Sequence, residues 1–406
     1  MFWKGAEAEP EPDSLMRFTS SIEKLGHCEE MLLKRHVSTP FKRHLVQPKG
    51  KDWAINTVVF NGPTDPRHVV YTDRSTLVIT HGYGSGLGFF YPNYDHFASL
   101  RDRQGRPVQV VTIDWLGMGR SSRPLFAKRT RSNEDKHSNE ALIQQAEDYF
   151  VNSLESWRQE LGLTKFALAG HSLGGYLSGC YALKHHQHLT SLTLVSPFGM
   201  PSHPPNSTPL GNVSKDLSFA QRFFFNAWTN NYTPQWLLRG LGPYGMRLAS
   251  RVVSGRFPQM DENDQRLVAD YVFHLSTVRP AAGEYALNAL MELRMVPHAP
   301  ATHYEDLKEQ VSNAERRRQN PAGTFGLFAR HPIGVRLLDL PKTLPINVIY
   351  GDNDWMFSNR KSILSLDVVS DRRASKLAVI EGAGHHLYLD NAQQFFQVVK
   401  ESRLWG

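Results

Sequence analysis

The chain has 406 residues, of which 40% are hydrophobic and 21% are charged, and these proportions are typical of a globular protein with a large core. The formal charge of +7 suits an anionic partner, either nucleic acid or a phospholipid surface, and charge alone does not distinguish the two. The two cysteines, Cys28 and Cys180, lie far apart and outside any metal-binding spacing, which excludes a disulfide or zinc framework.

Targeting and membrane signals are weak along the whole chain. No apolar run approaches the roughly 18 residues of a membrane-spanning helix, so any contact with a bilayer is expected to be peripheral. The start, MFWKGAEAEPEPDSLM, lacks the apolar segment of a secretory signal and carries acidic residues that transit peptides avoid. We therefore expect an intracellular protein. No RNA-binding or zinc-finger signature occurs, so nucleic acid is not expected as a partner.

Residues 1–50 are expected to form an amino-terminal extension that is partly helical. The segment SSIEKLGHCEEMLLKRHVS places four apolar residues near one helical face: Ile22, Leu25, Met31 and Leu32. Basic residues follow, and they could contact anionic lipid or simply face solvent: Lys34, Arg35, His36, Lys42 and Arg43.

Short β-rich runs then alternate with helical patterns. The runs STLVIT (75–80), VQVVTID (108–114), FALAG (166–170) and LTLVS (192–196) predict strands of βαβ units, so residues 51–199 are expected to form the first part of an α/β core. Between two of these strands, apolar residues recur at helical spacing and predict a helix that packs on the sheet: Ile143, Ala146, Phe150, Leu154, Trp157 and Leu161.

The strand rhythm stops after SPFGMP at 196–201 and resumes at INVIYGD, 346–352. Residues 200–340 are therefore expected to be an inserted helical cap, rich in aromatic residues. Residues 341–406 are expected to complete the core, with the last strand in KLAVIEG at 376–382 and a closing helix after it. The predicted fold class is α/β, a mostly parallel sheet flanked by helices.

The stretch AGHSLGGYLSG places Ser172 in a sharp turn between a predicted strand and a predicted helix, which is the context of a nucleophile elbow. The serine of such an elbow has a strained backbone, so Gly170 and Gly174 stand where a Cβ would collide with the neighbouring chain. Serine is unreactive at its own pKa and needs a base that is itself oriented by an acid.

Two later strand ends supply an acid and a base. Asp354 follows the strand INVIYG, with Asp352 as the alternative acid, and His385 follows the strand KLAVIEG. The chain order Ser172, Asp354, His385 is that of the α/β-hydrolase fold. A developing oxyanion needs two donors, and we assign the backbone N–H groups of Tyr83, in THGYGSGLGFF, and of Leu173. No residue cluster suggests a metal, and no cofactor is implied.

Several motifs together resemble the α/β-hydrolase-domain lipid hydrolases: HGYGSGLGFF, DWLGMGRSSRP, GHSLGG, SPFGMP, GPYGMRL and GAGHHLYLD. The resemblance covers nearly all of the chain. It points to the branch of the N-acylphosphatidylethanolamine lipase, the lipid-droplet lipase coactivator and the mitochondrial cardiolipin deacylase. His385 and Asp390 also match the H-x4-D pattern that this family links to acyl transfer onto a lysophospholipid, although Asp390 could equally cap the following helix.

The resemblance implies a serine hydrolase that cleaves acyl esters of glycerophospholipids, of the phospholipase, lysophospholipase or cardiolipin-deacylase type. Two alternatives stay open: a lysophosphatidic acid acyltransferase that uses His385 and Asp390, and a non-catalytic lipid-droplet coactivator. The expected partner is a phospholipid or other long-chain acyl ester at a membrane or lipid-droplet surface. The expected location is the cytoplasm, peripheral to that surface, with the mitochondrion as an alternative.

Overall fold

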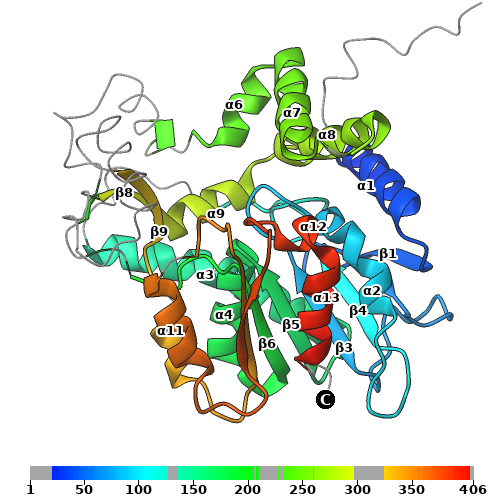
Figure 1. The fold of residues 1–406 in the computed structure, drawn as a ribbon. Coiled ribbons are helices and arrows are strands. Elements are labelled where there is room, and N and C mark those ends of the chain that lie inside the picture. Colours follow the sequence, from blue (N-terminus) through cyan, green and yellow to red (C-terminus); the bar gives the residue numbers. More distant parts are fainter. Residues whose placement is uncertain are drawn as a thin grey trace, which may run out of the picture.

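The computed structural model describes residues 21–126, 136–202, 204, 207–209, 227–228, 230, 232–258, 260–296, 324–357 and 359–402. An eight-stranded sheet forms its centre, in the order β1-β2-β4-β3-β5-β6-β10-β11 (Figure 1). Its strands are β1 Phe41–Val46, β2 Ile55–Phe60, β3 Thr76–Thr80, β4 Gln109–Ile113, β5 Phe166–His171, β6 Leu189–Val195, β10 Ile346–Gly351 and β11 Lys376–Ile380. The pairs β1–β2 and β2–β4 are antiparallel, and all other neighbours are parallel.

The predicted fold class is confirmed, and the six predicted strands lie within a few residues of β3, β4, β5, β6, β10 and β11. Strands β1 and β2 were not predicted. β1 reads FKRHLV and is an edge strand with polar side chains, so it lacks the apolar run of a central strand. It also lies within residues 1–50, so part of the expected extension belongs to the main sheet.

Helices cover both faces of the sheet, as a buried parallel sheet requires. One face is covered by α3 Lys136–Glu160, α4 Leu173–His185 and α11 Asn359–Val369, with the short turns η4 His186–His188 and η6 Arg336–Asp339. The other is covered by η2 Leu87–Asn93, α2 Tyr94–Ala98, α12 Leu387–Asp390 and α13 Ala392–Glu401. The predicted apolar stripe along α3 and just after it faces the core: Ala146, Phe150, Leu154, Trp157 and Leu161 are buried, and Ile143 is partly buried against them.

The insertion contains four described helices above the sheet (Figure 1): α6 Pro234–Gly240, α7 Pro243–Arg256, α8 Glu262–Thr277 and α9 Ala282–Leu290. It also contains a small antiparallel sheet that was not predicted, formed by β7 Thr208–Pro209, β8 Met291–Val296 and β9 Thr324–Ala329. Residues 210–226 and 297–323 of the expected cap lie outside the described residues. In the described part of the chain, no helix has the length and apolar character needed to cross a membrane.

The amino-terminal helix α1 Ile22–His36 packs against α8 of the cap (Figure 1). Leu25 and Leu32 are buried there as predicted, whereas Met31 faces solvent. The basic residues that follow contact groups of the protein itself. Arg35 forms an ion pair with Asp264 of α8, and Lys34, Lys42 and Arg43 contact Glu30 or backbone carbonyl groups. These contacts favour an internal structural role over lipid binding for this segment.

Helix α1 also buries a carboxyl group. Glu29 is fully buried, and it accepts hydrogen bonds from the Asn56 amide at 3.1 Å and the Arg120 guanidinium at 3.2 Å. Burial raises its pKa to about 8, and the nearby Asp114 carboxylate acts in the same direction, against the opposing effect of Arg120. The folded protein therefore binds a proton here that the unfolded chain releases near the usual value of 4.5.

The stability provided by this proton is complete below pH 4.5 and is lost as the pH rises through about 8. Replacing Glu29 by Gln removes the titration, so the stability of the variant relative to the natural chain should rise with pH. We expect a gain on the order of 2–4 kcal/mol between about pH 5 and about pH 8, measured by urea unfolding. The matched control is Glu30→Gln on the same helix. Lys34 and Arg43 lower the pKa of Glu30, so the stability of Glu30→Gln relative to the natural chain should not change over this pH range. An equal pH dependence for both variants would contradict the raised pKa of Glu29.

Candidate active site

Ser172 stands at the junction of β5 and α4 with φ 55° and ψ −115°, a strained conformation for a residue other than glycine. Two glycines make room for this turn. A Cβ on Gly170 would lie 2.3 Å from the carbonyl oxygen of Gly174, and a Cβ on Gly174 would lie 2.4 Å from that of His81. Because backbone atoms cannot yield to such contacts, any larger residue would displace the elbow.

The structure brings the three predicted catalytic side chains together from the ends of β5, β10 and β11. The distance between Ser172 Oγ and His385 Nε2 is 2.9 Å, and that between His385 Nδ1 and Asp354 Oδ1 is 3.0 Å. The same carboxylate oxygen accepts the Met356 backbone N–H at 2.8 Å. The arrangement allows His385 to take the Ser172 proton while Asp354 holds the imidazole in orientation.

Asp354 and Asp352, the two candidate acids, occupy different environments. Burial alone would raise the pKa of Asp354, but the hydrogen bond and the charge of His385 outweigh it and lower that pKa. Asp352 points to the loop before His385, where its two oxygens accept the N–H groups of Gly382 and Ala383, both at 3.0 Å. The geometry therefore favours Asp354 as the partner of His385 and assigns Asp352 to the loop.

A second histidine supports the backbone of His385. The Nε2 of the buried His171 lies 2.9 Å from the carbonyl oxygen of His385, and its Nδ1 lies 3.4 Å from the Tyr388 hydroxyl. Burial lowers the pKa of His171 well below its usual value, and the neighbouring His385 and His386 act in the same direction. A neutral ring donates from Nε2 and accepts at Nδ1 in this arrangement, a tautomer assigned from its partners. No role was predicted for His171 from the sequence.

The predicted oxyanion donors lie on the other side of Ser172. A Cβ on Gly82 would be 3.0 Å from the Cβ of Ser172, so the loop that carries Tyr83 packs directly against the serine. Within the described chain, the backbone N–H groups of Tyr83 and Leu173 have no hydrogen-bond acceptor. The Tyr83 hydroxyl donates to Gln235 of α6, which connects this loop to the cap. The oxyanion assignment itself stays a prediction.

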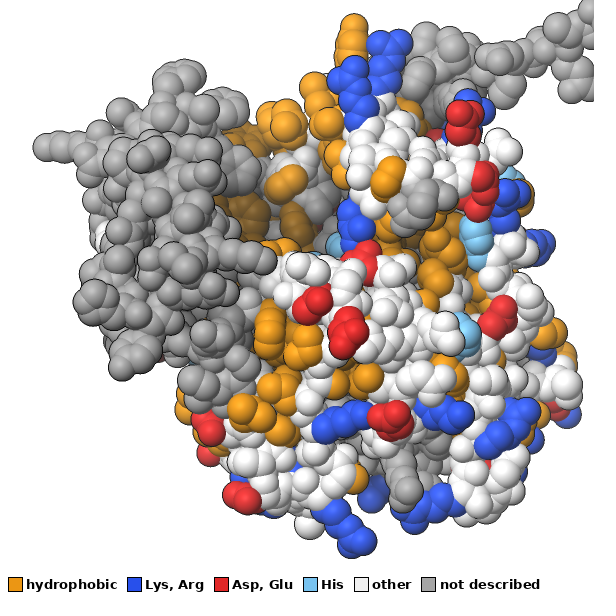
Figure 2. All heavy atoms as spheres, in the orientation of Figure 1, with side chains coloured by type: hydrophobic (Ala, Val, Ile, Leu, Met, Phe, Trp, Pro, Cys, Tyr) orange, Lys and Arg blue, Asp and Glu red, His pale blue; other side chains and the backbone are white. Residues whose placement is uncertain are grey.

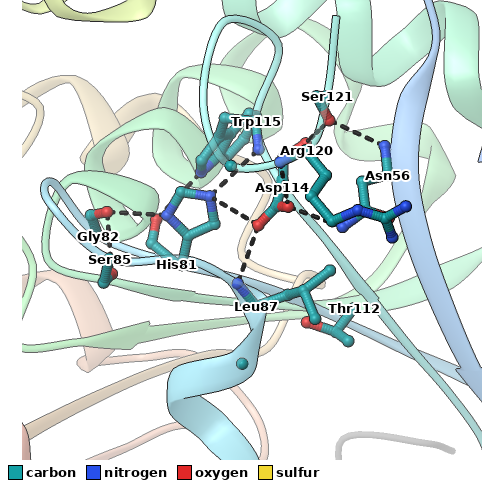
Figure 3. Close-up of polar contacts among 12 residues, drawn as sticks. Asn56, His81, Gly82, Ser85, Leu87, Thr112, Asp114, Trp115, Arg120 and Ser121 are labelled. Atoms are coloured by element: carbon teal, nitrogen blue, oxygen red, sulfur yellow. Dashed lines mark hydrogen bonds and ion pairs between the residues drawn. The ribbon is translucent and has the colours of Figure 1, made fainter. Parts of the chain in front are cut away.

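A buried polar network that sequence reasoning missed supports this loop (Figure 3). Asp114 follows β4, and its carboxylate accepts the backbone N–H groups of Leu87 and Arg120, both at 2.9 Å. The Trp115 N–H donates to His81 Nε2 at 3.2 Å, and His81 Nδ1 lies 2.8 Å from the Gly82 carbonyl oxygen. Burial lowers the pKa of His81, so a neutral ring joins the two turns. The one sign of this network in the sequence was the aspartate at the end of the predicted strand 108–114, Asp114.

Asp390, the last residue of the H-x4-D pattern, does not cap the helix that follows it. The N-cap of α13 is Asn391, whose side chain accepts the Gln394 N–H at 3.1 Å. Asp390 instead ends α12, where the turn of the chain directs its carboxylate back toward the loop before His385. It accepts the Gly384 N–H at 2.9 Å and forms an ion pair with Arg256 of the cap.

A serine at a strand-to-helix elbow, joined through histidine to a buried aspartate on a mostly parallel sheet, defines the class of the α/β hydrolases. The family described as "alpha/beta hydrolase fold" matches residues 75–392, which is most of the chain. This chain belongs to the α/β-hydrolase family.

Relatives place the chain in the branch of this family whose members are named as N-acylphosphatidylethanolamine lipases and 1-acylglycerol-3-phosphate acyltransferases. The mouse "(Lyso)-N-acylphosphatidylethanolamine lipase" is 31% identical over 333 residues, which cover 81% of this chain and 79% of that protein. The rice "Probable 1-acylglycerol-3-phosphate O-acyltransferase" is 30% identical over 352 residues, which cover 85% of this chain and 69% of that protein. The crystal structure of the carboxylesterase CesB from Bacillus subtilis has a TM-score of 0.52 over 93% of this chain and 96% of that chain, at 14% identity, and shows the fold alone.

The two candidate acids can be separated by the reactivity of Ser172 toward a fluorophosphonate probe. Asp354→Asn should slow labelling by about 10³-fold to 10⁴-fold, because the amide does not hold His385 in the tautomer that accepts the Ser172 proton. Asp352→Asn keeps an acceptor oxygen for the loop and serves as the matched control. We expect it to label within about tenfold of the natural chain. Equal losses in the two variants would contradict the choice of Asp354.

Proposed function

We propose that this chain is a serine hydrolase that cleaves acyl esters of glycerophospholipids, with Ser172 as nucleophile, His385 as general base and Asp354 as the orienting acid. The observation that carries the proposal is the unbroken hydrogen-bonded series from Asp354 through His385 to Ser172. Ser172 is available as a nucleophile at its elbow, which argues against the alternative of a non-catalytic coactivator.

The reaction proceeds through an acyl-enzyme. Ser172 Oγ attacks the acyl carbonyl carbon while His385 Nε2 takes its proton, and the backbone N–H groups of Tyr83 and Leu173 stabilise the oxyanion. The bond to the glycerol oxygen then breaks, and His385 gives the proton to the leaving lysolipid. Water attacks the acyl carbon with His385 again as base. The bond from that carbon to Ser172 Oγ then breaks as His385 returns the proton to Oγ, and the fatty acid leaves. Asp354 stabilises the imidazolium in both halves.

Two features support a lipid substrate. The relatives carry names that refer to N-acylphosphatidylethanolamine and 1-acylglycerol-3-phosphate. Trp355, whose side chain is 62% exposed, lies 5.1 Å from the ring of His385 and offers an apolar contact beside the reacting atoms. A phospholipid or other long-chain acyl ester is the proposed substrate, at a membrane or lipid-droplet surface to which the protein binds peripherally.

Acyl transfer is the second candidate, because a relative at 30% identity is named as a probable 1-acylglycerol-3-phosphate O-acyltransferase. The two reactions share the acyl-enzyme and differ only in the second nucleophile. When the hydroxyl of lysophosphatidate replaces water, His385 takes the proton of that hydroxyl and passes it to Ser172 Oγ as the acyl–serine bond breaks, and the new ester is phosphatidate.

Product analysis with purified protein separates the two reactions. Incubation with phosphatidylethanolamine vesicles should release free fatty acid, and Ser172→Ala should reduce this release by about 10³-fold or more, because the acyl-enzyme does not form. A second incubation contains oleoyl-CoA and lysophosphatidate, and phosphatidate as its main product would favour transfer. Ser178→Ala, on the same helix, serves as the control. Retention of either activity in Ser172→Ala would exclude Ser172 catalysis of that reaction, whereas absence of both activities from the natural chain would favour the coactivator alternative.

A further inference from the structure

Helix α7 has two apolar faces, and only one of them is covered. Met246, Ala249 and Val253 are buried, with Met246 and Ala249 packed against Phe273 of α8. Tyr244, Leu248 and Val252 recur at intervals of four residues and therefore line another face of the helix. This second stripe is open to solvent: Tyr244 is 67% exposed and Val252 is 59% exposed.

The open stripe continues onto α6. Trp236 and Leu237 are 46% and 51% exposed, and the Tyr232 ring lies 4.5 Å from that of Trp236. Single exposed apolar side chains are common, but a group of neighbouring ones marks a binding surface. Figure 1 places α6 and α7 at the top of the molecule, and Figure 2 shows hydrophobic and basic side chains together there. We name this surface the α6–α7 face.

The charge around the α6–α7 face has one sign. Residues 232–256 contain four arginines and no Asp or Glu. Arg239 pairs with Glu284, and Arg256 pairs with Asp390. Arg247 and Arg251 are exposed, and neither has an acidic partner among the described residues. These two charges, beside an apolar stripe, are complementary to an anionic surface with an apolar interior.

We propose that the α6–α7 face binds the surface of an anionic phospholipid membrane. Trp236 and Tyr244 have the amphipathic rings that favour the interface, while Arg247 and Arg251 contact the headgroups. The inference deepens the proposed function, on which it rests for the lipid partner. The face is also joined to the site, because Gln235 of α6 accepts a hydrogen bond from the hydroxyl of Tyr83, whose loop packs against Ser172. Binding in this orientation brings lipid to the cap side of the sheet.

Binding is measured in the Ser172→Ala background, so that the vesicles are not consumed. The probes are vesicles of phosphatidylcholine, alone or mixed with phosphatidylserine, in a flotation assay. Arg247→Gln with Arg251→Gln should weaken partitioning to the anionic vesicles by about 30-fold, from ~1 kcal/mol for each arginine near an anionic surface, and should flatten the salt dependence. Tyr244→Ser with Val252→Ser should weaken binding to both kinds of vesicle.

The control is Arg103→Gln with Arg373→Gln, which removes the same charge from exposed loops before β4 and β11, at the end of the sheet opposite to Ser172. Equal loss in this control would show that net charge alone drives binding and would overturn the proposal. No loss in either pair on the α6–α7 face would also overturn it. Melting temperatures exclude unfolding. Activity remaining in Ser172→Ala would defeat the proposed function and leave this result intact.

A different observation concerns Asp390. The loop before His385 is held by two carboxylates: Asp352 accepts the N–H groups of Gly382 and Ala383, and Asp390 accepts that of Gly384. The second carboxylate is 13% exposed and is paired with Arg256, at the end of α7. A continuous series of contacts therefore runs from the cap to the residue before His385.

We infer that Asp390 is a positioning residue for His385 and that Arg256 couples this position to the cap. The inference rests on the proposed role of His385 as base. The carboxylate contacts Gly384 and Arg256, so its effect on Ser172 passes through the backbone. Loss of Asp390 should then slow the attack of Ser172 itself, whichever nucleophile follows.

The test is the labelling rate by a fluorophosphonate, together with kcat and KM for p-nitrophenyl butyrate with water or lysophosphatidate as acceptor. Asp390→Ala should lower kcat about tenfold to a hundredfold for both acceptors, with KM little changed. Asp390→Asn keeps an acceptor for Gly384 and should lose less. Arg256→Gln should add nothing to Asp390→Ala, because both break one series of contacts, and Arg256→Lys should retain activity.

Loss confined to the lysophosphatidate acceptor would overturn this inference, because it would make Asp390 a residue of acyl transfer. Additive losses in Asp390→Ala and Arg256→Gln, or no loss in either, would also overturn it. If Asp390→Ala does not fold, Asp390→Asn and Arg256→Gln give the same comparison. His385→Ala tests the proposed function separately, since activity in that variant would remove the base that Asp390 is inferred to position.

Discussion

The backbone turn at Ser172 depends on the close approach of the carbonyl groups of Gly174 and His81, which leave no room for a Cβ on Gly170 or Gly174. The strained φ of 55° is tolerated where Gly170 and Gly174 carry no side chain and the carbonyl of His81 fits against the start of α4. Because His81 lies against the start of α4, the next residue in its loop, Gly82, packs directly against Ser172 and forms one side of the site. Every other part of the site is arranged relative to this fixed hydroxyl, which reaches the imidazole of His385 without a change of backbone.

The remaining support comes from packing between segments that are far apart in sequence. The α8 helix of the cap contacts both the amino-terminal helix, through Asp264, and the core loop at Gly88, whose N–H donates to the Tyr271 hydroxyl at 3.1 Å. Glu29 of α1 reaches the same buried network as Asp114. Extension, cap and core are thus joined by polar as well as by apolar contacts.

Local patterns were sufficient for the parallel strands and for the positions of Ser172, Asp354 and His385, because each follows a buried apolar run and strand ends of this topology meet at one edge. Contacts that depend on the fold were beyond such patterns. The role of His171 depends on a carbonyl more than 200 residues away, and the contacts of Asp390 depend on a cap helix. The polar edge strand β1 carries no apolar run that would reveal it.

The order of the segments has a consequence for the synthesis of the protein. Ser172 precedes the insertion, whereas β10 and β11, which carry Asp354 and His385 at their ends, are the last two strands of the sheet. In a nascent chain, the elbow serine is therefore synthesised more than 200 residues before the imidazole of His385. Premature termination at or before codon 385 would leave the serine without the imidazole that hydrogen-bonds to it in the folded chain.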